Sequence, residues 1–108
     1  MKIEIINTTD KNRYNCVKYA RSRYSSLPYG LWTLRDKTKI INSFTPKMLE
    51  CVAIIDAGFW GHIAIVVEFT GDEHNPSDIV IEEANYLSGK ITRRSGTPKE
   101  LKILGYFI

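Results

Sequence analysis

The chain has few cysteines, no long apolar stretch and no block of like charges, and each absence excludes a class of protein. Its two cysteines among 108 residues are too few for a disulfide scaffold. No apolar run approaches the roughly 20 residues of a membrane-spanning helix, so we expect no membrane insertion. The net charge is only +3, without a run of like charges or a basic stripe interleaved with aromatics. We therefore expect no nucleic-acid partner.

A signal peptide and a metal centre are also missing from the pattern. Glu4 interrupts the short apolar run near the N-terminus, which argues against a signal peptide and predicts a protein made in the cytoplasm. The cysteines and histidines lack zinc-ligand spacing, so we expect no metal and no cofactor. Hydrophobic content of 44% and charged content of 25% are ordinary globular values. These values predict one domain over residues 1–108, and we expect it to be a monomer.

The order of the predicted elements indicates the fold class. Apolar spacing of three, four and seven residues predicts a helix over about residues 14–24, and a weaker helix over 31–42. The second half alternates β-branched runs with turn residues, which is typical of strands. The predicted strands cover residues 51–56, 61–69, 78–85, 90–94 and 102–108. We therefore predict an α+β fold, with N-terminal helices packed on a C-terminal antiparallel sheet of about five strands.

Cys16 and His62 are the residues whose chemistry suggests an enzyme. Cys16 lies where the first predicted helix begins, and the N-terminal end of a helix favours a thiolate. His62 lies at the start of the best predicted strand, where its imidazole could act as base and acid. Backbone N–H groups at the helix start, with the side chain of Asn15, could stabilise an oxyanion. The pair predicts a cysteine nucleophile, provided that the fold brings the two side chains together.

The predicted hairpin supplies a group that could orient the imidazole. If Phe69 pairs with Asp78, His62 lies opposite Asn85, and Glu83 is its diagonal neighbour on the same face. Both residues are therefore candidates for orienting the imidazole of His62. Glu83 would hold it by charge, and Asn85 would hold it by a neutral hydrogen bond. The preceding glutamate, at position 82, points to the other face, and a slip of one residue would select it instead.

Each of these signals also has an ordinary explanation. A single cysteine on an amphipathic helix most often packs in the core, and Cys51, in an apolar strand, fits that description. A histidine at a strand start is usually a satisfied polar residue. Trp60 and Tyr86 flank the predicted site on both strands, where they could line a groove or pack in the core. Two alternative functions therefore remain open beside a hydrolase of one particular amide. One is an amidase that acts on a different amide substrate, and the other is a catalytically silent binding or structural module.

Three segments taken together resemble the CHAP family, the cysteine- and histidine-dependent amidohydrolases and peptidases. They are Asn15-Cys16-Val17-x-Tyr19-Ala20, then Gly61-His62-Ile63-Ala64-Ile65-Val66, then Glu83-Ala84-Asn85-Tyr86 followed by Gly89-Lys90-Ile91. The closing Gly105-Tyr106-Phe107-Ile108 is similar to the family's final strand. The order and spacing match across nearly the whole chain. Asn15 stands where the family often has glutamine.

The resemblance implies a papain-like fold and cleavage of amide bonds in bacterial peptidoglycan. It implies Cys16 as the nucleophile, His62 as general base and acid, and Glu83 or Asn85 as the group beside His62. The substrate would be the stem peptide or its cross-bridge, cut by an N-acetylmuramoyl-L-alanine amidase or an endopeptidase without a cofactor. A phage lysin, a phage virion component or a delivered effector would each act on the cell wall without its own export signal.

Overall fold

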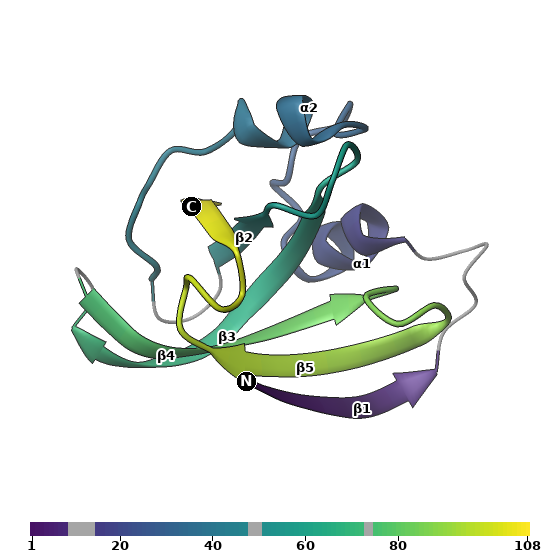
Figure 1. Ribbon diagram of the computed structural model, residues 1–108. Helices are drawn as coiled ribbons and strands as arrows, with labels where there is room; N and C mark the ends of the chain where they lie inside the picture. The colour runs from purple at the N-terminus through teal and green to yellow at the C-terminus, as the bar shows by residue number, and fades with distance from the viewer. Residues whose placement is uncertain (9–14, 48–50, 73–74) are drawn as a thin grey trace.

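A six-stranded antiparallel sheet dominates the computed structural model, which describes residues 1–8, 15–47, 51–72 and 75–108 (Figure 1). The strand order across the sheet is β1-β5-β4-β3-β2-β6. The elements, in chain order, are β1 (Lys2–Thr8), α1 (Cys16–Arg23), α2 (Leu34–Thr38), β2 (Cys51–Ile55), β3 (His62–Asp72), β4 (Asn75–Ala84), β5 (Lys90–Gly96) and β6 (Ile103–Phe107). No helix among these described residues is long and apolar enough to cross a membrane.

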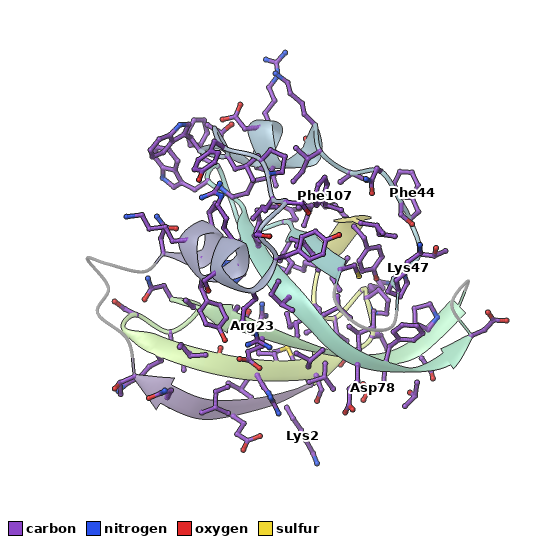
Figure 2. All side chains as sticks on the ribbon, turned by 180° about the vertical axis from the view of Figure 1, so that it is seen from behind. Lys2, Arg23, Phe44, Lys47, Asp78 and Phe107 are labelled. Carbon is purple, nitrogen blue, oxygen red and sulfur yellow. The ribbon has the colours of Figure 1, made fainter. Side chains whose placement is uncertain are left out.

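The sheet bends strongly, and its central strands are buried on both faces. In Figure 1, β3 rises steeply from the part formed by β4 and β5, and α1 packs in the angle against β3 and β4. Successive side chains of β2 point to opposite faces of the sheet, so that Ala53 enters one apolar cluster and Ile54 enters another. Figure 2 shows the side chains that fill this interior, with Phe107 turned inward and Lys2 turned to solvent. The N-terminal end of β3 is thereby fixed between two packed layers.

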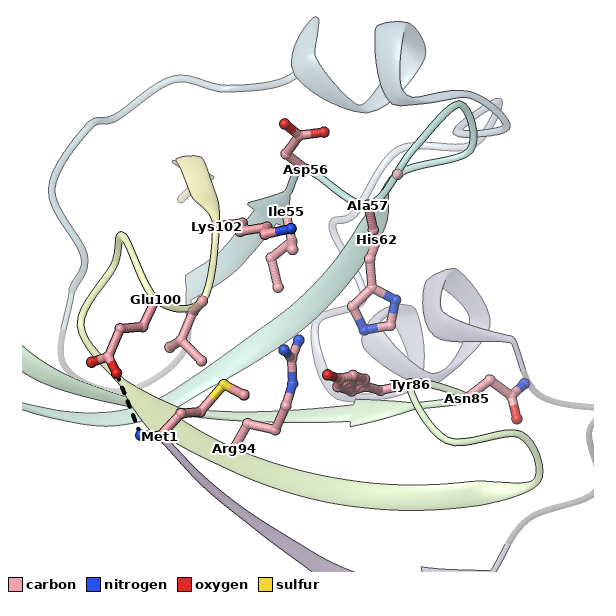
Figure 3. Close-up of a pocket in the computed structure, with 12 residues that line it drawn as sticks. Met1, Ile55, Asp56, Ala57, His62, Asn85, Tyr86, Arg94, Glu100 and Lys102 are labelled. Atoms are coloured by element: carbon pink, nitrogen blue, oxygen red, sulfur yellow. Dashed lines mark hydrogen bonds and ion pairs between the residues drawn. The ribbon is translucent and has the colours of Figure 1, made fainter.

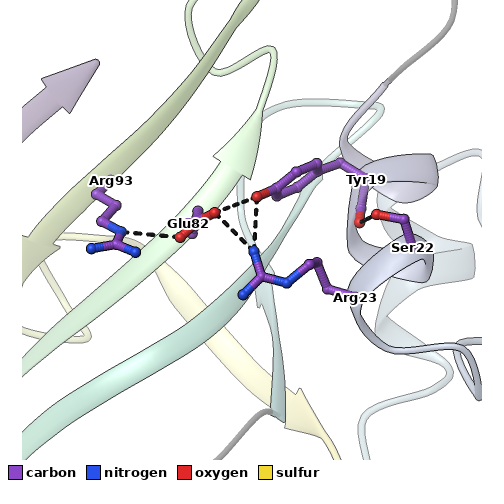
Figure 4. A network of polar contacts seen from close by, with 5 residues as sticks. All are labelled: Tyr19, Ser22, Arg23, Glu82 and Arg93. Carbon is purple, nitrogen blue, oxygen red and sulfur yellow. Dashed lines mark hydrogen bonds and ion pairs between the residues drawn. The ribbon is translucent and has the colours of Figure 1, made fainter. Parts of the chain in front are cut away.

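A buried carboxylate fastens α1 to the sheet (Figure 4). Glu82 of β4 is 4% exposed and accepts hydrogen bonds from the Tyr19 hydroxyl and from Arg23 Nη1 of α1, the latter at 2.9 Å. On its other side, Arg93 Nε of β5 donates to it at 3.0 Å. Because two cations and a phenol share one carboxylate, this cluster fixes the helix against the sheet. It also places the first residue of α1, Cys16, over the start of β3.

The predicted fold class is wrong. Of the residues that the structure describes, 47% are strand and only 14% are helix, so the protein is mostly antiparallel sheet rather than papain-like with helices packed on a C-terminal sheet. β1 was not predicted, although polar and apolar residues alternate from Lys2 to Ile5, and all seven of its residues are exposed in the structure. The helix predicted over residues 31–42 shrinks to α2, which starts at a Thr33–Asp36 capping box. After α2 the chain is no longer helical, and Ser43 forms an isolated antiparallel β-bridge with Tyr106. Residue 14, the predicted start of the first helix, lies outside the described residues.

The predicted register of the β3–β4 hairpin is wrong at the loop end and right near the site. Phe69 pairs with Ile79 rather than with Asp78. A β-bulge between Val66 and Glu68 then shifts the register by one residue, so that Val66 lies opposite Ile81 as predicted. The strands also extend into residues that we predicted as a loop. The bulge restores the alternation that places Glu83, and not Glu82, on the face of His62.

Gly61, directly before His62, sits where the β2–β3 connection touches α2. Its φ is +67°, and a Cβ added to it would lie only 3.0 Å from Leu34 Cα, which leaves no room for a side chain. We expect Gly61→Ala to lower the free energy of unfolding by about 2–4 kcal/mol, from backbone strain and overpacking together. Gly58→Ala is the matched control. Gly58 has a similar φ of +74°, but a Cβ added to it would have no atom within 4 Å apart from those of its chain neighbours. Equal losses in the two variants, measured by urea denaturation, would show that contact with Leu34 is unimportant.

Candidate functional site

Cys16 is the first residue of α1 and lies against the start of β3. The side-chain oxygen of Asn15 caps the helix by accepting from Lys18 N at 2.8 Å. With the helix start held by this cap, the thiol lies close enough to the His62 ring and to the N–H of Ile63 for both groups to lower its pKa. The nucleophile predicted from the sequence therefore does meet the predicted imidazole.

His62 lies between the thiol and a buried carboxylate. Its Nε2 is 3.1 Å from Glu83 Oε1, and Glu83 is completely buried. Because Nε2 faces this carboxylate, Nδ1 is the ring nitrogen that remains for the thiol. Cys16, His62 and Glu83 thus form a continuous line of thiol, imidazole and carboxylate, which is the arrangement that nucleophilic catalysis by cysteine requires.

Two further residues, both from β5, hold Glu83 in place. Arg94, 6% exposed, donates from Nε and Nη2 to Glu83 Oε1 at 2.9 and 2.6 Å. The Thr92 hydroxyl donates to Oε2 at 3.3 Å. An ion pair with Arg94 allows a charged carboxylate to remain in the interior, where an isolated one would be costly. The carboxylate is consequently held in place behind His62.

Lys37 of α2 is a buried cation near the thiol. It is 3% exposed, and its Nζ donates to the backbone oxygens of Trp32 at 3.1 Å and Trp60 at 2.6 Å. Its charge also interacts with that of Cys16. Burial lowers the pKa of Lys37, and the charges of Cys16 and Asp36 oppose that effect. Lys37 therefore ties two chain segments together beside the site and adds a positive charge there.

These surroundings favour a thiolate paired with an imidazolium. Burial opposes ionisation of Cys16, but the hydrogen bond and charge of His62, with the Ile63 N–H and Lys37, outweigh it and lower the thiol pKa. Burial would likewise depress the pKa of His62. Hydrogen bonds and charges from Cys16 and Glu83 instead raise the pKa of His62 to about 9. The two groups stabilise each other's charged forms and titrate as a pair.

Asn85 and Asn15 each use the side-chain oxygen to accept a backbone hydrogen bond. The carboxylate of Glu83 accepts the hydrogen bond from the His62 ring, and Asn85 Oδ1 accepts from Gly89 N at 2.8 Å. With a φ of +61°, Asn85 shapes the turn between β4 and β5. The oxygen of Asn15 accepts the helix-capping hydrogen bond, and its amide nitrogen is the donor that the side chain offers toward a substrate.

The two predicted aromatic residues lie in different environments. The ring of Tyr86 is 36% exposed, stands 6.3 Å from the His62 ring between centroids, and carries the Arg94 guanidinium 3.6 Å above it. Trp60 is 63% exposed and packs edge to face on Phe59. Tyr86 therefore lines a pocket together with His62, and Trp60 is not among the residues that line that pocket.

The two cysteines are expected to react very differently. Cys51 is buried in β2, where desolvation raises its pKa, and Lys47 N donates to its sulfur. At pH 7 we expect iodoacetamide to modify Cys16 about tenfold faster than a free cysteine, because a larger thiolate fraction outweighs a lower intrinsic nucleophilicity. Cys51 should stay unmodified in the folded protein. Peptide mapping after timed labelling measures both rates, and equal slow labelling would contradict an activated Cys16.

Sequence reasoning missed Arg94 and Lys37. Arg94 could have been predicted from the strand pairing. Glu83 pairs with Thr92 across β4 and β5, and because side chains alternate along a strand, Arg94 lies on the same face as Thr92. Nothing in the local pattern around Lys37 distinguishes it from a surface lysine. Among the described residues, no group of three or more His, Cys, Asp or Glu side chains could hold a metal ion.

The arrangement as a whole can perform acyl transfer. It combines an activated thiol, an imidazole able to accept and donate a proton, and a buried carboxylate that holds the imidazole. The N–H groups of the first turn of α1 lie beside the thiol, where an oxyanion would form. Comparisons of the chain with protein-family models, with curated proteins and with solved structures found no match.

Proposed function

We propose that this protein is a cysteine hydrolase that cleaves amide bonds of bacterial peptidoglycan through an acyl-enzyme. The observation that carries the proposal is the line from Cys16 through His62 to Glu83. A structural cysteine needs neither an imidazole beside it nor a buried carboxylate behind that imidazole. The substrate class rests on the likeness of the three sequence segments to the CHAP family, and either amidase or endopeptidase activity fits it.

The proposed reaction starts with attack by the Cys16 thiolate on the scissile carbonyl carbon. A C–S bond forms, and backbone N–H groups at the start of α1, with the amide nitrogen of Asn15, stabilise the oxyanion. His62 then gives its proton to the amine nitrogen as the C–N bond breaks, which leaves a thioester. Neutral His62 next takes a proton from water, whose oxygen attacks the thioester. The acid departs and the thiolate is restored.

Glu83 and Arg94 act behind the reacting atoms in this scheme. Glu83 fixes the ring of His62 and stabilises its protonated form, and Arg94 holds Glu83 in an ion pair. His62 must carry a proton when the amine leaves, and its pKa is raised to about 9. Activity should therefore rise with pH as Cys16 ionises and fall as pH passes about 9, where His62 loses its proton.

Digestion of purified peptidoglycan tests the proposal directly. We would incubate it with the protein, with Cys16→Ala and with Cys51→Ala, and identify the released ends by mass spectrometry. New N-termini within the peptides indicate an endopeptidase, and separated glycan and peptide indicate an amidase. Activity in the parent and in Cys51→Ala, but not in Cys16→Ala, is the expected result. No product from the parent at any pH would favour a catalytically silent binding module.

A further inference from the structure

A pocket of about 470 Å³ opens on the face of the sheet that carries His62 (Figure 3). His62, Tyr86 and Arg94 line it together with Asp56, Glu100 and Lys102. Cys16 is not among its lining residues. The volume lies in the range of small-ligand sites, and both charge signs are present around it. This pocket plays no part in the mechanism described so far.

The proposed reaction decides which half of a substrate could enter this pocket. His62 must protonate the departing amine, so the amine half of the substrate has to lie beside His62. The acyl half stays on Cys16 until water releases it. Because His62 lines the pocket and Cys16 does not, the pocket is on the amine side of the scissile bond.

The charges of the pocket indicate the chemistry of that half. In Figure 3, the guanidinium of Arg94 and the ammonium of Lys102 point into the space between them. Lys102 is exposed and makes no ion pair with any described residue. Of the acids nearby, Glu83 is engaged by Arg94, and Glu100 accepts from Thr97 N and from the Met1 amine. Asp56 also lines the pocket, and its carboxylate points away from Arg94 (Figure 3). The space between the two cations therefore suits an anion.

We propose that this pocket holds the leaving-group half of the substrate, and that a carboxylate on that half binds between Arg94 and Lys102. The inference rests on the proposed function. A short leaving group fits the pocket, such as the terminal amino acid of a stem peptide or a short cross-bridge peptide. Arg94 then has two partners, Glu83 behind it and the substrate carboxylate in front. Planar guanidinium groups suit such carboxylate contacts, and stacking on Tyr86 fixes the plane of this one.

Binding of short amines tests this inference without turnover. We would titrate the Cys16→Ala protein with diglycine and with diglycinamide, which share a free amine and differ in the carboxylate, and follow backbone resonances by NMR. We expect shifts at His62, Tyr86 and Arg94, and at least threefold tighter binding of diglycine. Lys102→Gln should at least halve that preference. Lys99→Gln is the matched control, because Lys99 is a nearby lysine that does not line this pocket.

The outcomes separate the inference from the proposed function. Equal affinity for the two ligands, shifts elsewhere in the protein, or a preference untouched by Lys102→Gln would overturn the carboxylate site, even if the parent protein digests peptidoglycan. Absence of any digestion would refute the proposed function. In that case, a carboxylate preference sensitive to Lys102→Gln would still establish the pocket as an anion site.

Discussion

Replacing His62 by asparagine is expected to slow alkylation of Cys16 at pH 7 by about tenfold and to reduce peptidoglycan cleavage by about 10³- to 10⁴-fold. The imidazolium supplies the hydrogen bond and the charge that lower the thiol pKa. Without it, burial remains and raises that pKa, so the pH at which alkylation begins should move upward. The larger loss in cleavage follows because the variant also lacks the proton donor for the leaving amine.

The pH dependence distinguishes this role of His62 from a purely structural one. Alkylation rates of the parent and of His62→Asn would be measured from pH 5 to 10, with circular dichroism as the check on folding. A structural role would leave the titration of Cys16 unchanged in a folded variant. His74→Asn, which alters the chain's other histidine, is the control and should keep the parental profile. An unshifted Cys16 profile in folded His62→Asn would contradict the thiolate–imidazolium pair.

The central pair could be anticipated because each half depends on a local rule. Apolar spacing predicts a helix over about residues 14–24, with Cys16 near its start, and alternation along a strand predicts the face of His62. Glu83 followed from the same alternation, even though the starting pair of the register was off by one. The bulge after Val66 removes that error before the strands reach the site. The prediction for Glu83 thus depended on a bulge that the sequence pattern does not reveal.

The missed features depend on contacts between distant segments. β1 is an exposed edge strand with only a short alternation of polar and apolar residues, and its pairing with β5 is visible only in the structure. Lys37 becomes buried because the chain before α2 and the connection before β3 fold over it and present two carbonyl oxygens. Asn85 shares the face of Glu83 in an ideal strand, but β4 ends before it and a positive φ turns it into the connection.

Removing the charge of Glu83 is expected to cost both stability and activity. Glu83→Gln leaves Arg94 buried without its counter-charge, and breaking a buried pair in this way costs about 3 kcal/mol. It also removes a charge that raises the pKa of His62. The alkaline fall in activity should therefore begin below pH 9. Glu82→Gln is the control on the neighbouring residue. This variant disturbs the contact of α1 with the sheet. It should leave unchanged the pH above which activity falls, because Glu82 contacts Tyr19 and Arg23 rather than His62.

A double variant separates the two effects of Glu83. In Glu83→Gln with Arg94→Met the unpaired buried charge is gone, so most of the lost free energy of unfolding should return in urea denaturation. Cleavage should not return, because His62 still lacks the carboxylate that orients it and favours its proton. Since Arg94→Met also removes the proposed contact with the substrate carboxylate, the pH at which activity falls is the measurement that reports on His62. Recovery of activity together with stability would mean that Glu83 serves the fold alone. Recovery of stability with slow cleavage and a lowered alkaline limb would make it a positioning residue for His62.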